Sequence, residues 1–544
     1  MKKLVSRFMA VLMVMTMILS MSMTTFAAED ATRLTGTGKL TVNNTVEGKT
    51  LDLYQIFTAT KNEAGNVAYT LNPEYEGFFK ANVNGASELT DEALSEKAYE
   101  YVEKQVGKDG KNGVNFAKAM LTWILSNTST VDATHKTVTT ATGSTEIANL
   151  AYGYYVVYPL GATDTSAAPG NGQNYTSVAS LVSVTDTNAT VNMKSNYPTV
   201  VKKVNDKTAD DVNIGDTVTY TLTSKVPDMT GYTSYVFNFK DTLSAGLTFK
   251  EITSVTVGAG ENVQNVTEGT GDNTYRLEQI GQNITITMNN FLASNANKVG
   301  QEIKVTYTVT LNKDAVTGFD ANKNSATVEY SNKPGTDNKG ESEPSIVDVH
   351  TFNFTIFKYY LKGADKTGLA NAEFELYKAN EAGNAADENA KINIVKVKDG
   401  EYRQATPEEA AAEGFKSDVI VSGSNGKVLV KGLDAGTYYL RETKAPEGYN
   451  KLLSDITVVI KADYDVKTGK LTSYSVDYTY NGKTTNGAAI TNKTDSPEVA
   501  VENKTGAQLP STGSKGALMV TLAGIVLFGA LTASKAFGKK KANN

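Results

Sequence analysis

Short runs of alternating apolar and polar residues recur through most of this chain, and they limit its fold more than any other feature. Residues 218–222 and 303–309 are clear examples, with an apolar side chain at every second position. A β-strand points alternate side chains to opposite faces, so the pattern predicts half-buried strands joined by Gly, Asn and Asp turns. Only residues 90–126 have a helical pattern, with Trp123 on the apolar face. We therefore expect an all-β fold of tandem sandwiches with one small helical insertion.

The 544 residues of the chain are too many for one hydrophobic core, because single domains rarely exceed about 250 to 300 residues. Two short proline-containing segments, around Pro198 and Pro344, interrupt the strand pattern. We place domain boundaries at these segments. The predicted domains are residues 28–196, 197–343 and 344–508.

The first residues of the chain have the features of a secretory signal peptide. Lys2, Lys3 and Arg7 precede an uncharged apolar run over residues 8–23, and a Thr-Phe-Ala site follows it. This order predicts cleavage of residues 1–27 and export of the remainder. The sequence contains no cysteine, so an exported protein of this kind would need a cross-link other than a disulfide to stabilise it.

The C-terminal residues 509–544 contain a motif, an apolar segment over residues 517–534 and a lysine-rich tail. The motif consists of Leu509, Pro510, Ser511, Thr512 and Gly513. This order resembles the sorting signal of Gram-positive cell-wall proteins. The resemblance implies that a sortase cysteine attacks the Thr512 carbonyl, Gly513 leaves with the membrane-spanning tail, and an amine resolves the thioester. Pilin-type and housekeeping sortases and peptidoglycan would then be partners.

Other classes of function are disfavoured by composition. The formal net charge is −6, and basic residues form no block outside the two termini, which argues against nucleic acid as a partner. His135 and His350 are the only histidines and lie far apart in the sequence. Without cysteine or a histidine cluster, we expect no metal, no cofactor and no enzyme beyond sites that process the chain itself.

The third predicted domain has the most specific internal motifs. They are the segments 354–358, 438–449 and 499–504, the second of which contains the string ETKAPEGY. This region resembles the B-type repeat of collagen-binding adhesins, which occurs in many pilins and has an immunoglobulin-like fold.

The strand pattern of this domain predicts a buried lysine and a buried acid. Phe354, Ile356 and Lys358 share one strand face, so a phenylalanine in the core carries the lysine inward. Burial would cost Lys358 its proton and make it a nucleophilic amine. Leu440 and Glu442 share a face in the same way, and a buried Glu442 would be held protonated and could shuttle protons.

The resemblance supplies Asn503 as the acceptor for this amine. Lys358 would attack the side-chain carbon of Asn503 and expel ammonia. The resulting isopeptide bond would tie the first strand of the domain to its last. Asn492 remains open as an alternative acceptor.

The second predicted domain resembles the related A-type form. Val200, Lys202 and Val204 alternate toward the core, which leaves Lys203 to the solvent. The resemblance places the catalytic aspartate at Asp241.

The acceptor of this second bond is expected at Asn324, which leads into a strand, and Asn332 in the following turn is the alternative. The first domain has Tyr158 and Pro159 where an acid would be required. We therefore expect no bond there.

A polymerising pilin also needs an exposed lysine that receives the Thr512 thioester of the next subunit. In the family, this lysine ends the last strand of the first domain after Tyr-Pro, whereas here Lys194 precedes the Tyr-Pro pair. Lys194 is the predicted acceptor, with Lys202 and Lys203 as competitors. The predicted function is the shaft subunit of a cell-wall-anchored pilus made of identical subunits, and a monomeric wall-anchored adhesin is the alternative. A host surface ligand is left open.

Overall fold

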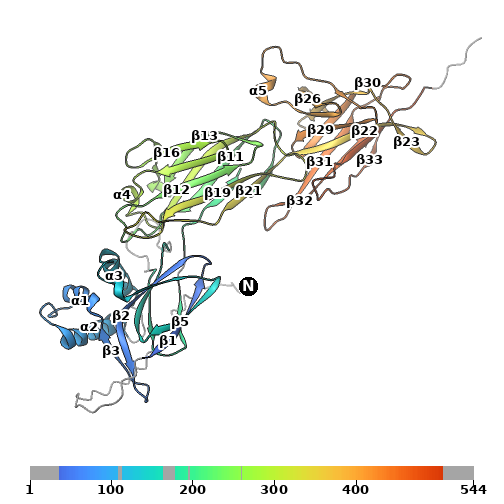
Figure 1. The fold of residues 1–544 in the computed structure, drawn as a ribbon. Coiled ribbons are helices and arrows are strands. Elements are labelled where there is room, and N and C mark those ends of the chain that lie inside the picture. The colour runs from blue at the N-terminus through green and yellow to red at the C-terminus, as the bar shows by residue number, and fades with distance from the viewer. Residues whose placement is uncertain (1–35, 108–112, 163–177, 194–195, 259, 507–544) are drawn as a thin grey trace, which may run out of the picture. The chain divides into compact units, whose positions relative to one another are not determined.

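The computed structural model describes residues 36–107, 113–162, 178–193, 196–258 and 260–506. Strands make up 49% of the structure and helices 12%, with the main helical segment near the start of the chain. The predicted all-β class with one early helical insertion is therefore confirmed (Figure 1).

Contacts between residues divide the chain into two compact units. The first unit contains residues 1–351 and 464–472, and the second contains residues 352–463 and 473–544. The further division of the first unit near residue 197 remains a prediction.

The first half of the first unit contains two sheets, with strand orders β5-β1-β8 and β3-β2-β6-β7, and β4 beside β2. The strands are β1 (Thr37–Thr45), β2 (Thr50–Lys61), β3 (Val67–Leu71), β4 (His135–Thr139), β5 (Gly143–Ala151), β6 (Gly153–Pro159), β7 (Ser180–Val184) and β8 (Ala189–Asn192). The helices are α1 (Glu76–Asn82), α2 (Asp91–Val106) and α3 (Gly113–Ser126), with 3-10 turns η1 (Pro73–Tyr75) and η2 (Asp132–Thr134).

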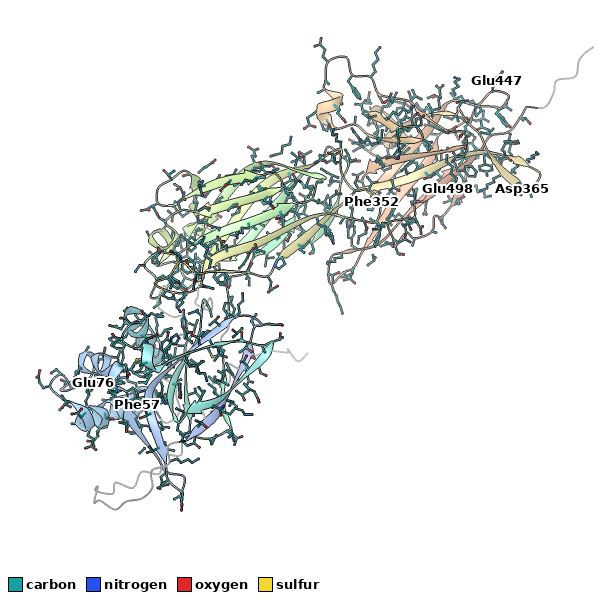
Figure 2. All side chains as sticks on the ribbon, in the orientation of Figure 1. Phe57, Glu76, Phe352, Asp365, Glu447 and Glu498 are labelled. Carbon is teal, nitrogen blue, oxygen red and sulfur yellow. The ribbon has the colours of Figure 1, made fainter. Side chains whose placement is uncertain are left out.

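These helices pack their apolar faces onto the core that includes Phe57 of β2, which is labelled in Figure 2. Phe78, Phe116 and Met120 are buried there. Trp123 is partly buried and its ring lies 6.1 Å from that of Phe78. The helical prediction over residues 90–126 is thus confirmed, whereas α1 was not predicted. None of the helices that the structure describes is long and apolar enough to cross a membrane.

The second half of the first unit also contains two sheets, green to yellow in Figure 1. The first has the order β14-β13-β18-β11-β9, and the second has the order β10-β21-β19-β12-β17-β16-β15 with β20 beside β19. The strands are β9 (Val201–Val204), β10 (Ala209–Asp211), β11 (Thr217–Lys225), β12 (Phe237–Leu243), β13 (Leu247–Val257), β14 (Gln264–Asn265), β15 (Thr267–Glu268), β16 (Thr274–Ile280), β17 (Asn283–Met288), β18 (Glu302–Leu311), β19 (Asn322–Ser331), β20 (Lys339–Glu341) and β21 (Ser345–His350). A short helix α4 (Phe291–Asn295) and a 3-10 turn η3 (Gly260–Asn262) complete it. One hydrophobic core joins the inner faces of the two sheets.

The second unit is again made of two sheets, with orders β23-β22-β29-β27-β26 and β25-β24-β30-β31-β32-β33. The strands are β22 (Phe352–Lys362), β23 (Asp365–Gly368), β24 (Glu373–Ala379), β25 (Ala386–Lys391), β26 (Ile394–Lys398), β27 (Glu401–Gln404), β28 (Ile420–Val421), β29 (Lys427–Leu433), β30 (Gly436–Lys444), β31 (Ile456–Tyr464), β32 (Leu471–Tyr480), β33 (Lys483–Thr485) and β34 (Glu498–Glu502), with one short helix α5 (Pro407–Ala410). The last strand, β34, pairs in parallel with the first strand, β22, and β28 pairs with β24.

Candidate functional site

The second unit buries a lysine and a glutamate that face each other from its two sheets. Phe354, Ile356 and Lys358 on β22 are all fully buried, in the alternation that the sequence predicts. Leu440 and Glu442 on β30, in the other sheet, are buried likewise. The strand geometry that carries the apolar residues into the core therefore carries both ionisable side chains in with them.

Lys358 and Glu442 form an ion pair inside this core. The distance from Lys358 Nζ to Glu442 Oε1 is 3.1 Å, and neither side chain is exposed. Burial lowers the pKa of Lys358 to about 8, although the carboxylate of Glu442 opposes the shift. A buried ammonium that releases its proton this readily can supply a neutral, nucleophilic amine near neutral pH.

Asn503 completes this cluster at the end of β34. The parallel register sets Lys358 opposite Val501, and the backbone N–H of Asn503 donates to the backbone carbonyl of Tyr359 at 2.9 Å. The Asn503 side chain, 1% exposed, donates from Nδ2 to the Asn450 carbonyl at 2.6 Å and to Glu442 Oε2 at 3.4 Å.

The loop after the ETKAPEGY string holds this arrangement in place with backbone groups. The Leu452 N–H donates to Glu442 Oε2 at 2.7 Å, and the backbone carbonyl of Asn450 accepts the hydrogen bond from the Asn503 side-chain amide. Glu442 thus has one oxygen toward the lysine and the other toward the asparagine, which is the position of a group that moves protons between them.

The reactive atoms of this cluster lack hydrogen bonds. Lys358 Nζ, Glu442 Oε1 and Asn503 Oδ1 are buried, and none makes a hydrogen bond within the described part of the chain. The lysine and glutamate atoms are within ion-pair distance but outside hydrogen-bond geometry. Buried polar atoms without partners are rare in folded proteins and require an explanation. A condensation between the lysine and the asparagine would provide one.

The first unit contains a second cluster of the same composition. Val201 is 55% exposed, whereas Lys202 beside it on β9 is 3% exposed, and Lys203 is exposed again. Lys202 Nζ contacts Asp241 Oδ2 of β12, which is 2% exposed, in a buried ion pair. Burial lowers the pKa of Lys202 to about 8 against the opposing effect of Asp241.

A tyrosine connects this pair to the predicted acceptor. Asn324 on β19 is fully buried and donates from Nδ2 to the Tyr307 hydroxyl at 3.0 Å. The hydroxyl in turn donates to Asp241 Oδ2 at 2.5 Å and accepts from Lys202 Nζ at 2.5 Å. Tyr307 could not be predicted from the sequence, because its only signal there is an inward position in the alternating run of β18.

The carbonyl oxygen of Asn324 and the second oxygen of Asp241 are also buried without a hydrogen bond in the described residues. In both clusters, then, the acceptor carbonyl oxygen and one carboxylate oxygen make no hydrogen bond in the described residues, and in the second unit that carboxylate oxygen is the one paired with Lys358. In the first unit, a proton on Asp241 Oδ1 could polarise the Asn324 carbonyl toward attack by the amine.

The alternative acceptors lie elsewhere. Asn332 is half-buried just beyond β19. Asn492 is exposed, donates from Nδ2 to Asp495 at 2.8 Å, and accepts the Thr494 N–H at 2.9 Å, which is a local turn geometry. The structure thus places Asn324 and Asn503, but not these two residues, at the buried lysines.

The first half of the first unit has a different buried acid, Asp52, whose partners among the described residues include His135, Thr137 and Tyr54. Asp52 Oδ1 lies 2.9 Å from His135 Nε2 and accepts from the Thr137 hydroxyl at 2.8 Å. Tyr158 is buried, as is Pro159 beside it. The predicted polymerisation lysine, Lys194, and the residues 509–513 lie outside the described part of the chain.

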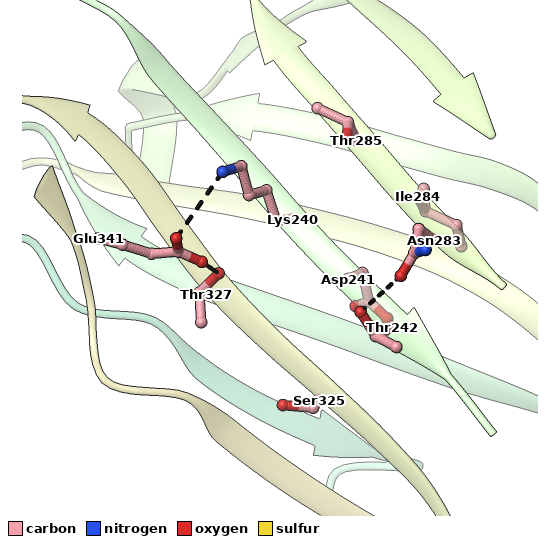
Figure 3. A pocket seen from close by; sticks show the side chains of 9 residues that line it. All are labelled: Lys240, Asp241, Thr242, Asn283, Ile284, Thr285, Ser325, Thr327 and Glu341. Carbon is pink, nitrogen blue, oxygen red and sulfur yellow. Dashed lines mark hydrogen bonds and ion pairs between the residues drawn. The ribbon is translucent and has the colours of Figure 1, made fainter. Parts of the chain in front are cut away.

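The outer face of β12 carries a shallow pocket whose charges are mutually paired (Figure 3). Lys240 Nζ is 2.8 Å from Glu329 and 3.7 Å from Glu341, and the Thr242 hydroxyl donates to Asn283 at 2.9 Å. Because alternate residues of a strand face opposite sides, Asp241 is turned inward between these outward neighbours. Asp241 is itself one of the residues that line the pocket, whereas Lys202 and Asn324 are not among them.

Two segments of the chain match known protein families. Residues 214–334 match the Gram-positive pilin backbone subunit 2, Cna-B-like domain, and residues 358–473 match the prealbumin-like fold domain of the SpaA family. The sequence predicts the A-type form for the second domain, residues 197–343. The matching model is described as Cna-B-like, so the A-type form remains a prediction. The trypsin-resistant surface T6 protein of Streptococcus pyogenes is 27% identical over 314 residues, 53% of this chain and 50% of that protein. The chain thus spans about half the length of the curated relative it matches.

Solved structures of major pilins align with parts of this chain. The T6 backbone pilin of serotype M6 Streptococcus pyogenes aligns with a TM-score of 0.46 at 17% identity, over 87% of this chain and 99% of that one. The major pilin SpaD of Corynebacterium diphtheriae aligns with a TM-score of 0.38 at 21% identity, over 76% and 88% of the two chains. By these matches, residues 214–334 contain a Cna-B-like domain like that of Gram-positive pilin backbone subunits, and residues 358–473 contain a prealbumin-like fold domain.

Proposed function

We propose that the chain is the shaft subunit of a covalently polymerised pilus on a Gram-positive cell surface. The observation that carries this proposal is the match of residues 214–334 to the pilin backbone family. A sortase would join Thr512 of one subunit to Lys194 of the next, and the last subunit would be attached to peptidoglycan. The catalysis of this assembly belongs to the sortases, so the chain itself is a structural protein.

The proposal includes an internal isopeptide bond in the second unit. The neutral Lys358 amine would attack the side-chain carbonyl carbon of Asn503, which forms a carbon–nitrogen bond. Glu442 would take a proton from the lysine nitrogen and deliver one to the amide nitrogen of the asparagine, which then leaves as ammonia. The buried ion pair and the 3.4 Å contact between Asn503 and Glu442 support these roles.

The same reaction is proposed for Lys202 and Asn324 with Asp241 as the acid. Each acid acts once on its own chain, so neither site is an enzyme active site with turnover. The low pKa of both lysines, about 8, supports the supply of a neutral amine.

The position of the bond in the second unit suits a load-bearing subunit. β22 is the first strand of this unit and β34 is its last, and the two are paired side by side in parallel. A bond from Lys358 to Asn503 would let tension pass directly from β22 to the residues that precede Thr512. The intervening chain would carry no load.

The polymerisation step is tested by immunoblotting of cell-wall extracts from cells that retain their sortases. Wild-type protein should form a ladder of covalent multimers. Lys194→Ala should reach the wall as a monomer, whereas Lys203→Ala, which removes an exposed lysine of the neighbouring strand, should keep the ladder. Thr512→Ala should abolish both polymer and wall attachment.

The absence of any ladder in the wild type would contradict the shaft proposal and favour a monomeric wall-anchored adhesin. A ladder that persists in Lys194→Ala would show that another lysine is the junction.

A further inference from the structure

The cluster of Lys202, Asp241 and Asn324 in the first unit is called the middle site below. We infer that Tyr307 is a catalytic residue of the middle site, and that its hydroxyl relays the proton between Asp241 and the departing amide nitrogen of Asn324. This inference rests on the proposed bond between Lys202 and Asn324. It adds a third participant to a reaction that otherwise needs only a lysine, an acid and an asparagine.

The Tyr307 hydroxyl touches every reacting group of the site. It accepts from Lys202 Nζ at 2.5 Å and from Asn324 Nδ2 at 3.0 Å, and it donates to Asp241 Oδ2 at 2.5 Å. A phenolic hydroxyl has one donor and two acceptor positions, so these three contacts use its whole hydrogen-bonding capacity. The oxygen is thus at the point where protons from the amine, the acid and the amide would cross.

The second unit shows why the middle site needs this relay. There the acid is Glu442, and its carboxylate contacts Lys358 at 3.1 Å and the Asn503 amide at 3.4 Å without an intermediary. In the middle site the acid is one methylene shorter, and its hydrogen bonds within the described residues go to Lys202 and Tyr307. Asn324 donates to the Tyr307 hydroxyl instead. The tyrosine therefore connects the asparagine to the acid, whereas in the second unit the longer glutamate contacts the asparagine directly.

The surroundings of Tyr307 fix its ring and keep its hydroxyl protonated. Tyr307 is 1% exposed and stacks on Tyr220 with ring centroids 5.4 Å apart, while Phe249 lies at 6.0 Å. Burial raises the pKa of Tyr307 well above its usual value. The phenol therefore acts as a neutral group that gives one proton as it receives another, and not as a base.

The proton movements balance. The Lys202 ammonium first gives a proton to Asp241, and the neutral amine attacks the side-chain carbon of Asn324. The amide nitrogen of the tetrahedral intermediate becomes a basic amine. Tyr307 donates its proton to that nitrogen and takes the proton of Asp241 in exchange.

In the last step the attacking nitrogen, which still carries an extra proton, returns it to Asp241. The bond between the carbon and the departing nitrogen then breaks, and ammonia leaves. The products are an amide between Lys202 and Asn324, one ammonia, an intact Tyr307 phenol and a protonated Asp241.

The test follows bond formation by intact mass at intervals after cell-free synthesis of residues 28–508, with peptide mapping to assign each bond. Tyr307→Phe keeps the ring and removes the hydroxyl. The bond in the second unit, Lys358 to Asn503, is an internal control in the same molecule. Tyr330→Phe is the matched variant, because Tyr330 is buried in the same core and its hydroxyl contacts Lys49 rather than a group of the site.

We expect Tyr307→Phe to form the bond of the second unit at the wild-type rate and the middle bond at least about 100-fold more slowly, since general acid–base catalysis contributes roughly that much or more. Tyr330→Phe should form both bonds at wild-type rates. A middle bond that forms at the wild-type rate in Tyr307→Phe overturns the inference. A wild type that loses no ammonia refutes instead the isopeptide bonds of the proposed function.

Two further variants probe the relay itself. Asp241→Glu combined with Tyr307→Phe should restore the middle bond, because the longer acid can reach the amide as Glu442 does, and a double variant as slow as the single one counts against the inference. If Tyr307→Phe does not fold, 3-fluorotyrosine at position 307 keeps the hydroxyl but makes it more acidic. It should change the rate of the middle bond alone, and equal rates for fluorinated and wild-type protein would overturn the relay.

Discussion

Replacing Glu442 with glutamine should remove the cross-link of the second unit while keeping the shape of its core. The introduced amide would preserve an oxygen that can accept the Leu452 N–H, but it cannot take a proton from Lys358 or give one to Asn503 as a carboxyl group can. The amine and the asparagine would then remain separate side chains. We therefore expect the variant to retain one ammonia that the wild type loses.

The stability lost with this bond follows from the loop that it closes, from residue 358 to residue 503. If a cross-link acts mainly on the entropy of the unfolded chain, a loop of this length contributes about 5 kcal/mol. For a unit of this size, 1 kcal/mol corresponds to roughly 2 to 4 °C in Tm, so the transition should fall by about 10 to 20 °C. The unbonded Lys358 ammonium, buried and deprived of its carboxylate, can only add to this loss.

Intact-mass spectrometry and differential scanning calorimetry on residues 28–508 measure the two effects. Glu447→Gln is the matched control, because it makes the same chemical change at an exposed position of the same string. It should leave both the ammonia loss and the melting profile unchanged. A Glu442→Gln protein that still loses both ammonia molecules would refute the role of the acid. One that retains the ammonia but melts within a few degrees of the wild type would refute the loop argument.

Three other predictions each concern the replacement of a single residue. Asp241→Asn should retain the ammonia of the middle bond, and intact mass with peptide mapping would detect a bond that survives. Asn492→Ala should lose both ammonia molecules as the wild type does, and retention of one would make Asn492 the acceptor in place of Asn503. Asn503→Ala leaves Lys358 free with a pKa of about 8 in the folded state, against about 10.4 when unfolded. Because the unfolded chain then binds more protons between these values, the free energy of unfolding of the second unit should rise by about 2.5 kcal/mol from pH 8 to pH 10.4. Denaturant titrations at several pH values would show this rise, and a flat profile would contradict the burial of a free amine.

The alternation of side chains made much of both sites predictable. A strand that buries Phe354 and Ile356 must also bury Lys358, and one that buries Val200 and Val204 must bury Lys202. Period two is a local property, so it can be read without knowledge of the fold. The helical region over residues 90–126 was likewise evident, whereas α1 was too short for its two buried phenylalanines to establish a helical period.

The parts that sequence could not supply depend on which strands become neighbours. Tyr307 is one of many inward residues in alternating runs, and it meets Lys202 only because β18, β11 and β9 are consecutive in one sheet. Asn450 and Leu452 act through backbone groups, which leave no trace in side-chain identity. The family resemblance could point to a lysine, an acid and an asparagine, but not to the groups that orient them.

The two sites would stabilise their units in different directions, because they join different pairs of strands. In the second unit, Lys358 and Asn503 belong to neighbouring strands of one sheet and only the acid comes from the facing sheet. A bond there prevents the last strand from sliding off the first. In the middle site, Lys202 lies on β9 of one sheet and Asn324 on β19 of the other. A bond there prevents the two sheets from separating and exposing the core between them. If both bonds form, the same chemistry would resist shear in one sandwich and opening in the other, depending on which strand carries the asparagine.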